Sequence, residues 1–133
     1  MEVNNTDSQE IVVKKKIEDF FIKSMKHRRK SGVCLVKDGM AVLTDKWSLF
    51  VLYNLGYFKK LRFSDLKDNI SGISSRMLSV TLKKLELHGL IFRRAYAEVP
   101  PRVEYTLTPI GLGMVEKAIE FNLWLLETKL NKE

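Results

Sequence analysis

Apolar residues recur three and four residues apart over most of the chain, which is the spacing of helices that each bury one face. The first such segment, residues 8–30, carries Val13, Ile17 and Phe20 at this spacing and is predicted to be a helix. It ends in the basic run 26–30. Two interpretations of that run stay open: a solvated helix end that suits the helix dipole, or an arm that contacts phosphates.

Two further helices are predicted in the segment that follows. Residues 35–43 form a short one. Residues 45–55 are apolar almost all round, so this helix is expected at the centre of the core. Gly56 follows directly and is expected to end it, because glycine often stands just past the end of a helix.

The next stretch has the pattern of two helices joined by a short, glycine-containing break. Residues 63–70 place apolar side chains on one face, with Ser64 as the expected N-cap. Ser74 is the expected N-cap of a longer helix over 75–88, and Gly89 is expected to end it. Two helices in this arrangement form a helix-turn-helix.

Beyond this motif the apolar period changes from that of a helix to that of a strand. Residues 90–96 and 103–107 predict two strands. The segment between them, 97–102, contains two prolines, which cannot donate hydrogen bonds to a strand ladder. A hairpin with a stiff tip, or wing, is therefore predicted directly after the helix-turn-helix.

The C-terminal part of the chain predicts a long helix. Thr108 is the expected N-cap and Pro109 the first helical residue of a helix over 109–130. Gly111 and Gly113 are expected to weaken its first turns. The apolar residues of this helix exceed what one face needs to cover a small domain.

Composition and charge narrow the kind of partner. The chain has 133 residues, 45% hydrophobic and 29% charged, as a globular domain does, and its net charge of +7 favours an anionic partner, nucleic acid before membrane. No apolar run reaches the length of a membrane span, and the polar N-terminus does not resemble a signal peptide. We therefore expect a cytoplasmic protein without membrane contact.

The second helix of a helix-turn-helix enters the major groove with its first turns nearest the bases. On helix 75–88, the side opposite the leucines is small, polar and basic. Arg76 is expected to contact guanine, and Lys83 and Lys84 to contact phosphates. The expected DNA-contacting residues of this helix are Ser74, Ser75, Arg76, Ser79, Val80, Lys83 and Lys84. The same pattern also fits the solvated face of an amphipathic helix.

Cations bracket the tip of the predicted wing. Arg93 and Arg94 precede the tip, and Arg102 follows it. A basic hairpin beside a recognition helix can contact an adjacent groove or the DNA backbone, and Arg102 in particular is expected on phosphates. The alternative is a solvated hairpin with scattered charge.

Taken in order, these motifs resemble the HxlR-type winged-helix regulators of bacteria and archaea. The resemblance runs from Cys34 onwards, with several motifs in the right order and spacing. The residues that carry it are Asp45–Leu49, Arg62–Leu66, Gly72–Ser79, Leu82–Glu86, Gly89–Ile91, Val99–Thr108 and Gly111.

The resemblance implies a regulator of transcription that binds double-stranded DNA as a homodimer. The N-terminal and C-terminal helices of the two subunits would pack together, and each recognition helix would contact half of a roughly palindromic operator. The expected fold is α+β but mainly α: a winged helix-turn-helix with flanking dimerisation helices and a two- to three-stranded wing sheet. The expected parts are an N-terminal extension helix, 1–30, a DNA-binding core, 31–108, and a C-terminal dimerisation helix, 109–133, within one structural domain.

Some members of that family respond to oxidants through a cysteine just before the second helix, and Cys34 stands at the matching place. A preceding basic run and a following helix both favour a thiolate. Two interpretations stay open for Cys34: a redox sensor, or a small buried side chain. The sequence departs from many relatives in having Leu35 rather than proline after this cysteine.

The sequence also bears on two functions other than DNA-binding regulation, and on an effector that would act together with DNA binding. A winged helix can serve protein–protein contacts alone, which predicts no salt-dependent DNA binding. An enzyme is not expected, because no catalytic or phosphate-loop motif is present, and one cysteine with two histidines does not suit a structural zinc site, so no metal or cofactor is expected. A small-molecule effector, itself unknown, could bind near Trp47, Phe50, Tyr53 and Trp124, although these rings also suit an ordinary core.

Overall fold

The computed structural model describes residues 5–31, 41–42 and 44–130, with backbone alone at 5, 24–31 and 130. The chain divides into two compact units, residues 1–41 and 42–133. The expected helix over 35–43 lies largely outside the described residues, as does Cys34.

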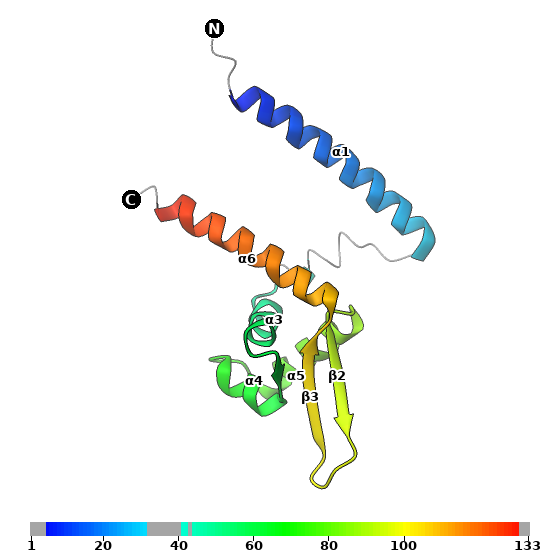
Figure 1. The fold of residues 1–133 in the computed structure, drawn as a ribbon, viewed down its shortest axis with the longest axis vertical. Helices are drawn as coiled ribbons and strands as arrows, with labels where there is room; N and C mark the ends of the chain where they lie inside the picture. The colour runs from blue at the N-terminus through cyan, green and yellow to red at the C-terminus, as the bar shows by residue number, and fades with distance from the viewer. Residues whose placement is uncertain (1–4, 32–40, 43, 131–133) are drawn as a thin grey trace. The chain divides into compact units, whose positions relative to one another are not determined.

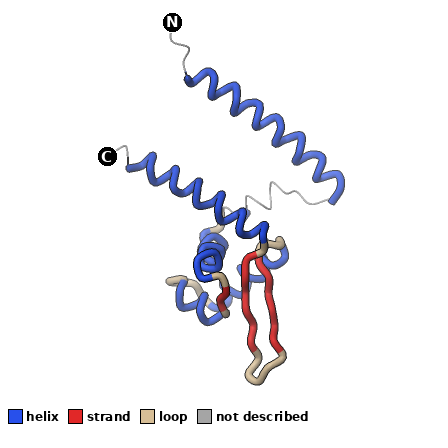
Figure 2. The backbone as a smooth tube through the Cα atoms, viewed as in Figure 1, coloured by secondary structure: helices blue, strands red, loops and turns tan. Residues whose placement is uncertain are grey.

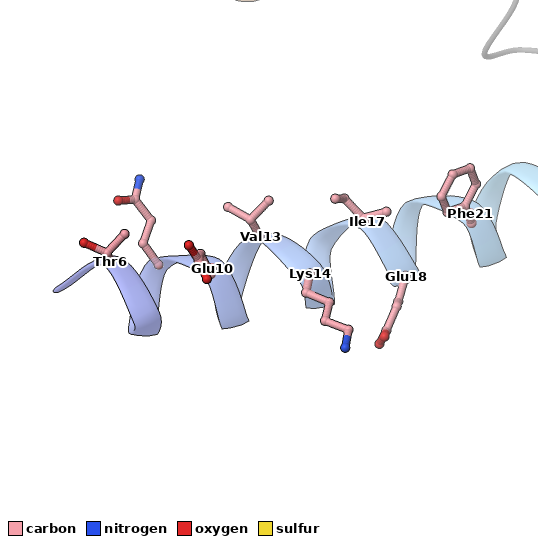
Figure 3. A pocket seen from close by; sticks show the side chains of 8 residues that line it. Thr6, Glu10, Val13, Lys14, Ile17, Glu18 and Phe21 are labelled. Carbon is pink, nitrogen blue, oxygen red and sulfur yellow. The ribbon is translucent and has the colours of Figure 1, made fainter. Parts of the chain in front are cut away.

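The main described element of the first unit is one long helix, α1 (Asn5–Ser31). Every side chain described on it, from residue 6 to residue 23, is exposed. Val13, Ile17 and Phe21 project from one side of the helix, while Lys14 and Glu18 project from the other (Figure 3). Taken by itself, the helix therefore exposes its apolar side chains.

The second unit contains six helices and strands that the sequence predicts, plus a short strand, in the order α3 (Lys46–Phe58), β1 (Lys60–Leu61), α4 (Phe63–Asn69), α5 (Ser75–Leu87), β2 (Ile91–Tyr96), β3 (Arg102–Leu107) and α6 (Pro109–Leu130). The strands form an antiparallel sheet in the order β1-β3-β2. Helices α3, α4 and α5 gather at one side of the hairpin β2–β3, whose tip extends beyond them (Figures 1 and 2). The predicted mainly helical winged helix-turn-helix with a small wing sheet is confirmed.

A single apolar core holds this unit together. Leu52 and Leu55 from α3 meet Leu78 and Leu85 from α5, and Leu66 from α4 closes the cluster; all five are at most 1% exposed. The expectation that the helix over 45–55 lies at the centre is therefore confirmed.

Helix α3 does not end at Gly56, as the sequence predicts. It continues to Phe58, and Lys59, with φ of 70°, ends it. A β-carbon at Gly56 would lie 3.4 Å from Val115 Cγ1, so this glycine lies close beneath α6 rather than in a turn. The two extra residues bring the chain directly to β1, whose Lys60 pairs with Thr106 of β3.

The N-caps agree with the sequence at two helices and differ at one. Ser74 Oγ accepts a hydrogen bond from the Met77 amide at 3.0 Å, and Thr108 Oγ1 accepts one from the Gly111 amide at 3.0 Å. The N-cap of helix α4, however, is Arg62 rather than Ser64. The backbone amide of Arg62 donates a hydrogen bond to Asp65 Oδ2 at 3.0 Å.

Candidate DNA-binding surface

Helix α5 is held by one face and presents the opposite one to solvent. Leu78, Leu82 and Leu85 point into the core and are at most 3% exposed. The Ser74 cap fixes where the helix begins, and Gly89, with φ of 72°, fixes where it ends. The outward face is therefore set by the spacing of the buried leucines.

The outward face carries most of the residues that the sequence singles out. Arg76 and Lys83 are exposed, Ser79 between them is half-buried, and Val80 is 54% exposed. Positions i, i+3 and i+7 lie along one side of a helix, so Arg76, Ser79 and Lys83 form one continuous stripe. Ser75 is exposed at the start of the helix.

Lys84 departs from the expected set of phosphate contacts. Its Nζ lies 3.2 Å from Asp45 Oδ2, and its side chain is only 30% exposed. Asp45 caps α3, accepting from the Trp47 amide at 3.1 Å and from Ser48 Oγ at 2.6 Å. Lys84 therefore joins the recognition helix to the start of α3.

The electrostatics of Asp45 agree with this structural role. Partial burial raises the pKa of Asp45, but the hydrogen bonds from Ser48 and Lys84 and the charge of Lys84 outweigh that effect. The pKa of Asp45 consequently lies below its usual value, and the carboxylate stays charged at neutral pH.

The wing arginines lie on opposite faces of the hairpin. Because side chains alternate along a strand, Arg93 shares a face with the buried Ile91, whereas Arg94 points the other way. Arg93 stands opposite Tyr105 in the sheet, and Arg94 stands opposite Glu104. The face with Arg93 is the one that packs on the helices.

On the other face of the hairpin, the arginines have partners within the wing. The Arg94 and Arg102 guanidinium carbons lie 4.8 and 4.0 Å from the ring centre of Tyr96. Arg102 Nη2 lies 3.1 Å from Glu98 Oε1, and its Nε lies 3.5 Å from Glu104 Oε1. Arg94 and Arg102 thus have partners within the wing, and only Arg93 keeps the expected free charge.

Glu104 is the hub of that face. Its side chain is 10% exposed, accepts from Tyr96 Oη at 3.1 Å and lies 3.4 Å from Lys60 Nζ. Burial raises the pKa of Glu104, but the Tyr96 hydrogen bond and the charges of Lys60 and Arg102 outweigh this and lower it. The outer face of the wing is therefore stiffened by a network that remains ionised at neutral pH.

The cations of α5 and of the wing differ in whether they have a partner within the protein. Within the part of the chain whose side chains are described, Arg76, Lys83 and Arg93 have no anionic or aromatic partner, whereas Lys84, Arg94 and Arg102 do. These three cations lie along α5 and on the adjoining face of β2. This is where a polyanion would find uncompensated positive charge.

A hollow of about 380 Å³ lies between α5 and the hairpin. Lys83 and Ser79 line it from the helix, and Arg93 lines it from β2. Its other walls come from Phe63, Leu82, Glu86 and Tyr105. We call it the α5–wing hollow.

A second concave surface, the α3–α6 groove, is apolar. It is lined by Leu49, Phe50 and Tyr53 of α3 and by Ile119, Leu123 and Leu126 of α6, among others. Asn122 Nδ2 donates to Tyr53 Oη at 2.5 Å across it. Of the four aromatic residues considered for an effector, Phe50 and Tyr53 line this groove; Trp47 packs partly buried against the core, and Trp124 is 59% exposed and stacks on Phe121.

Sequence reasoning missed the contacts that join distant segments. Asp45 has a local signal, since Asp is a favoured N-cap and an apolar helical segment follows it, but its pairing with Lys84 spans 39 residues. In the sequence, Glu104 is recognisable only as a charged residue in a predicted strand. In the structure it contacts three partners, Lys60, Tyr96 and Arg102. No cluster of three or more potential metal ligands occurs among the described residues, and none of the described helices could span a membrane.

Fold and surface together define a winged helix-turn-helix protein of the kind that binds DNA. The family model for the HxlR-like helix-turn-helix matches residues 42–132, so the chain belongs to this family of transcriptional regulators. The HTH-type transcriptional regulator YtfH of Escherichia coli K12, itself uncharacterised, is 38% identical over 92 residues, which cover 69% of this chain and 72% of YtfH.

Solved structures of transcriptional regulators share this fold. One described as a transcriptional regulator of the MarR family from Enterococcus faecalis V583 superposes with a TM-score of 0.67 at 30% identity, covering 73% of this chain and 87% of that one. The redox regulator HypR in its oxidised form superposes with a TM-score of 0.61 at 32% identity, covering 68% of this chain and 93% of that one.

Proposed function

We propose that this regulator binds a specific double-stranded DNA site as a homodimer, through the stripe Arg76–Ser79–Lys83 of α5 and through Arg93 of the wing. The observation that carries the proposal is the cation sorting: these are the described cations of α5 and the wing without an internal partner. In this proposal α5 enters the major groove and Arg76, in its first turn, contacts a base. We place its action in the cytoplasm with the DNA and assign it no enzymatic activity.

Replacing Arg76 with alanine tests the base contact. We expect a loss of roughly 1–3 kcal/mol on a duplex selected by the protein from a random library, and a much smaller loss on random-sequence DNA. The measurement is a fluorescence anisotropy titration of both duplexes at two salt concentrations. An equal loss on both duplexes would make Arg76 a phosphate contact instead, and wild-type binding no tighter on the selected duplex would favour a winged helix used for protein contacts.

The homodimer is supported by apolar side chains that the second unit leaves exposed on one long helix. On α6 the exposed fractions of Ile119, Leu123 and Leu126 are 43%, 51% and 57%. Monomeric proteins rarely expose contiguous apolar patches of this kind. We propose that α6 of two chains, with the apolar side of α1, forms the dimer interface, leaving the winged helix before it for DNA.

A two-fold dimer of this type predicts a palindromic site. The two recognition helices would contact half-sites about one helical turn, roughly 34 Å, apart. If the DNA sequences selected from the library contain no inverted repeat of a half-site, the two-fold arrangement is contradicted.

We further propose release of DNA by oxidants through Cys34. The support is the position of this cysteine in the sequence and the likeness to the redox regulator HypR. Adding diamide to the wild-type complex should lower its affinity, and Cys34→Ser should abolish that response while binding DNA normally when reduced. If diamide releases the Cys34→Ser protein as readily as the wild type, the thiol is not the sensor.

A further inference from the structure

We propose that the α5–wing hollow binds one backbone phosphate of the DNA, clamped between Lys83 of the recognition helix and Arg93 of the wing. The inference rests on the proposed DNA binding and specifies how one part of that surface works. It turns two cations from separate elements into a single site for a phosphate monoanion.

The first support is that both cations line the same hollow and neither forms an ion pair with a described residue. Lys83 and Arg93 come from α5 and β2, yet neither lies within ion-pairing distance of a described carboxylate. Glu86 also lines the hollow, so the wall carries two positive charges and one negative charge. Two like charges facing a shared space repel each other unless an anion lies between them.

The second support is the polar chemistry around the cations. The Ser79 hydroxyl has no hydrogen-bond partner among the described residues and lines the hollow from the turn before Lys83. A hydroxyl, an ammonium and a guanidinium are all donors, and charge-assisted donors are the groups that hold phosphate oxygens most strongly. Phe63, Leu82 and Tyr105 supply the walls, and Leu82 and Tyr105 are nearly buried, so the hollow has a fixed floor.

The third support is the position of the hollow. It adjoins the stripe that starts at Arg76, so a DNA strand leaving the major groove along α5 would pass over it. It also lies on the face of the hairpin that carries Arg93, whereas Arg94 points to the opposite face, where it lies over the Tyr96 ring. The phosphate site therefore fixes the angle between the recognition helix and the wing on DNA.

The test neutralises the phosphates of the selected duplex one at a time as methylphosphonates. For the wild-type protein, we expect one position per half-site to weaken binding about tenfold or more. For the double variant Lys83→Gln/Arg93→Gln, binding should be weaker overall, and neutralising that same position should have no further effect. Arg94→Gln is the matched control, because it removes the same charge from the next residue of β2 and should keep the wild-type response.

Salt dependence supplies a second measurement on random-sequence DNA. One lost phosphate contact per subunit should reduce the slope of log K against log salt by about 0.9 for each subunit. The losses of binding free energy in Lys83→Gln and Arg93→Gln should sum to more than the loss in the double variant, because both side chains contact the same phosphate. Circular dichroism is the check that these substitutions at exposed positions leave the fold intact.

The outcomes separate the two proposals. If the wild type binds DNA with salt dependence but the double variant keeps the full methylphosphonate response, the phosphate site is overturned while the proposed function stands. If the wild type shows no salt-dependent DNA binding, both are overturned. If inorganic phosphate saturates the hollow in NMR titration while methylphosphonate DNA binds the wild type as tightly as native DNA, the site belongs to a free anion and the proposal is overturned.

Discussion

Replacing Gly111 with alanine is expected to lower the free energy of unfolding by about 3 kcal/mol or more. A β-carbon at this position would lie 2.0 Å from the carbonyl oxygen of Leu90 and 3.3 Å from Leu107 Cδ2. That oxygen also accepts the Thr108 amide at 3.1 Å, so it cannot move aside without losing a hydrogen bond. Helix α6 would have to lift away from the end of the recognition helix.

Gly113, two residues further along the same helix, is the matched control. A β-carbon there would meet nothing within 4 Å, so alanine should stabilise the protein by about 0.5–1 kcal/mol through helix propensity. Urea unfolding followed by circular dichroism measures both changes. If the two alanine variants gained stability equally, helix propensity and not the Leu90 contact would control this turn.

The second large effect is expected at the proposed dimer interface, where Leu123→Asp should raise the dimer dissociation constant about 100-fold or more. Leu123 lines the α3–α6 groove and is half exposed in the single chain. A carboxylate placed in an apolar interface is desolvated without a partner, and in a two-fold dimer one substitution occurs twice. About 3 kcal/mol in total is enough for a 100-fold change.

Sedimentation equilibrium over a range of protein concentrations measures this change. Val99→Asp is the control, since it adds the same charge at a fully exposed position in the wing tip. The Leu123→Asp protein should bind a palindromic duplex more weakly and a single half-site almost as the wild type does. A Leu123→Asp protein that remains fully dimeric would place the interface elsewhere.

The parts of the fold that the sequence predicts correctly are those with local signals. The caps at Ser74 and Thr108 and the glycine at Gly89 act within three or four residues, so a linear pattern contains them. The same holds for the strand-like composition of β2 and β3. The outward face of α5 follows from the spacing of its leucines, which is why Arg76 and Lys83 are exposed as expected.

The parts that the sequence does not predict depend on contacts between distant segments. Whether Lys84 is free depends on where the start of α3 lies, and whether Arg94 or Arg93 meets the recognition helix depends on which face of the hairpin packs on it. Gly111 appears in the sequence only as a poor helix former. Its close approach to the Leu90 carbonyl, which favours glycine there, becomes visible only when β3 and α6 are placed.

The contacts around Thr108 give the protein a mechanical property. Thr108 Oγ1 donates to the carbonyl of Gly89 at 2.7 Å and caps α6 through Gly111, while its amide binds Leu90. One residue thus fastens the end of the recognition helix, the end of the wing and the start of α6 to one another. A rotation of α6 would therefore move α5 with it. In a pair of chains, the angle at which the two C-terminal helices cross would then determine the distance between the two recognition helices. The spacing of the two DNA half-sites would report that angle.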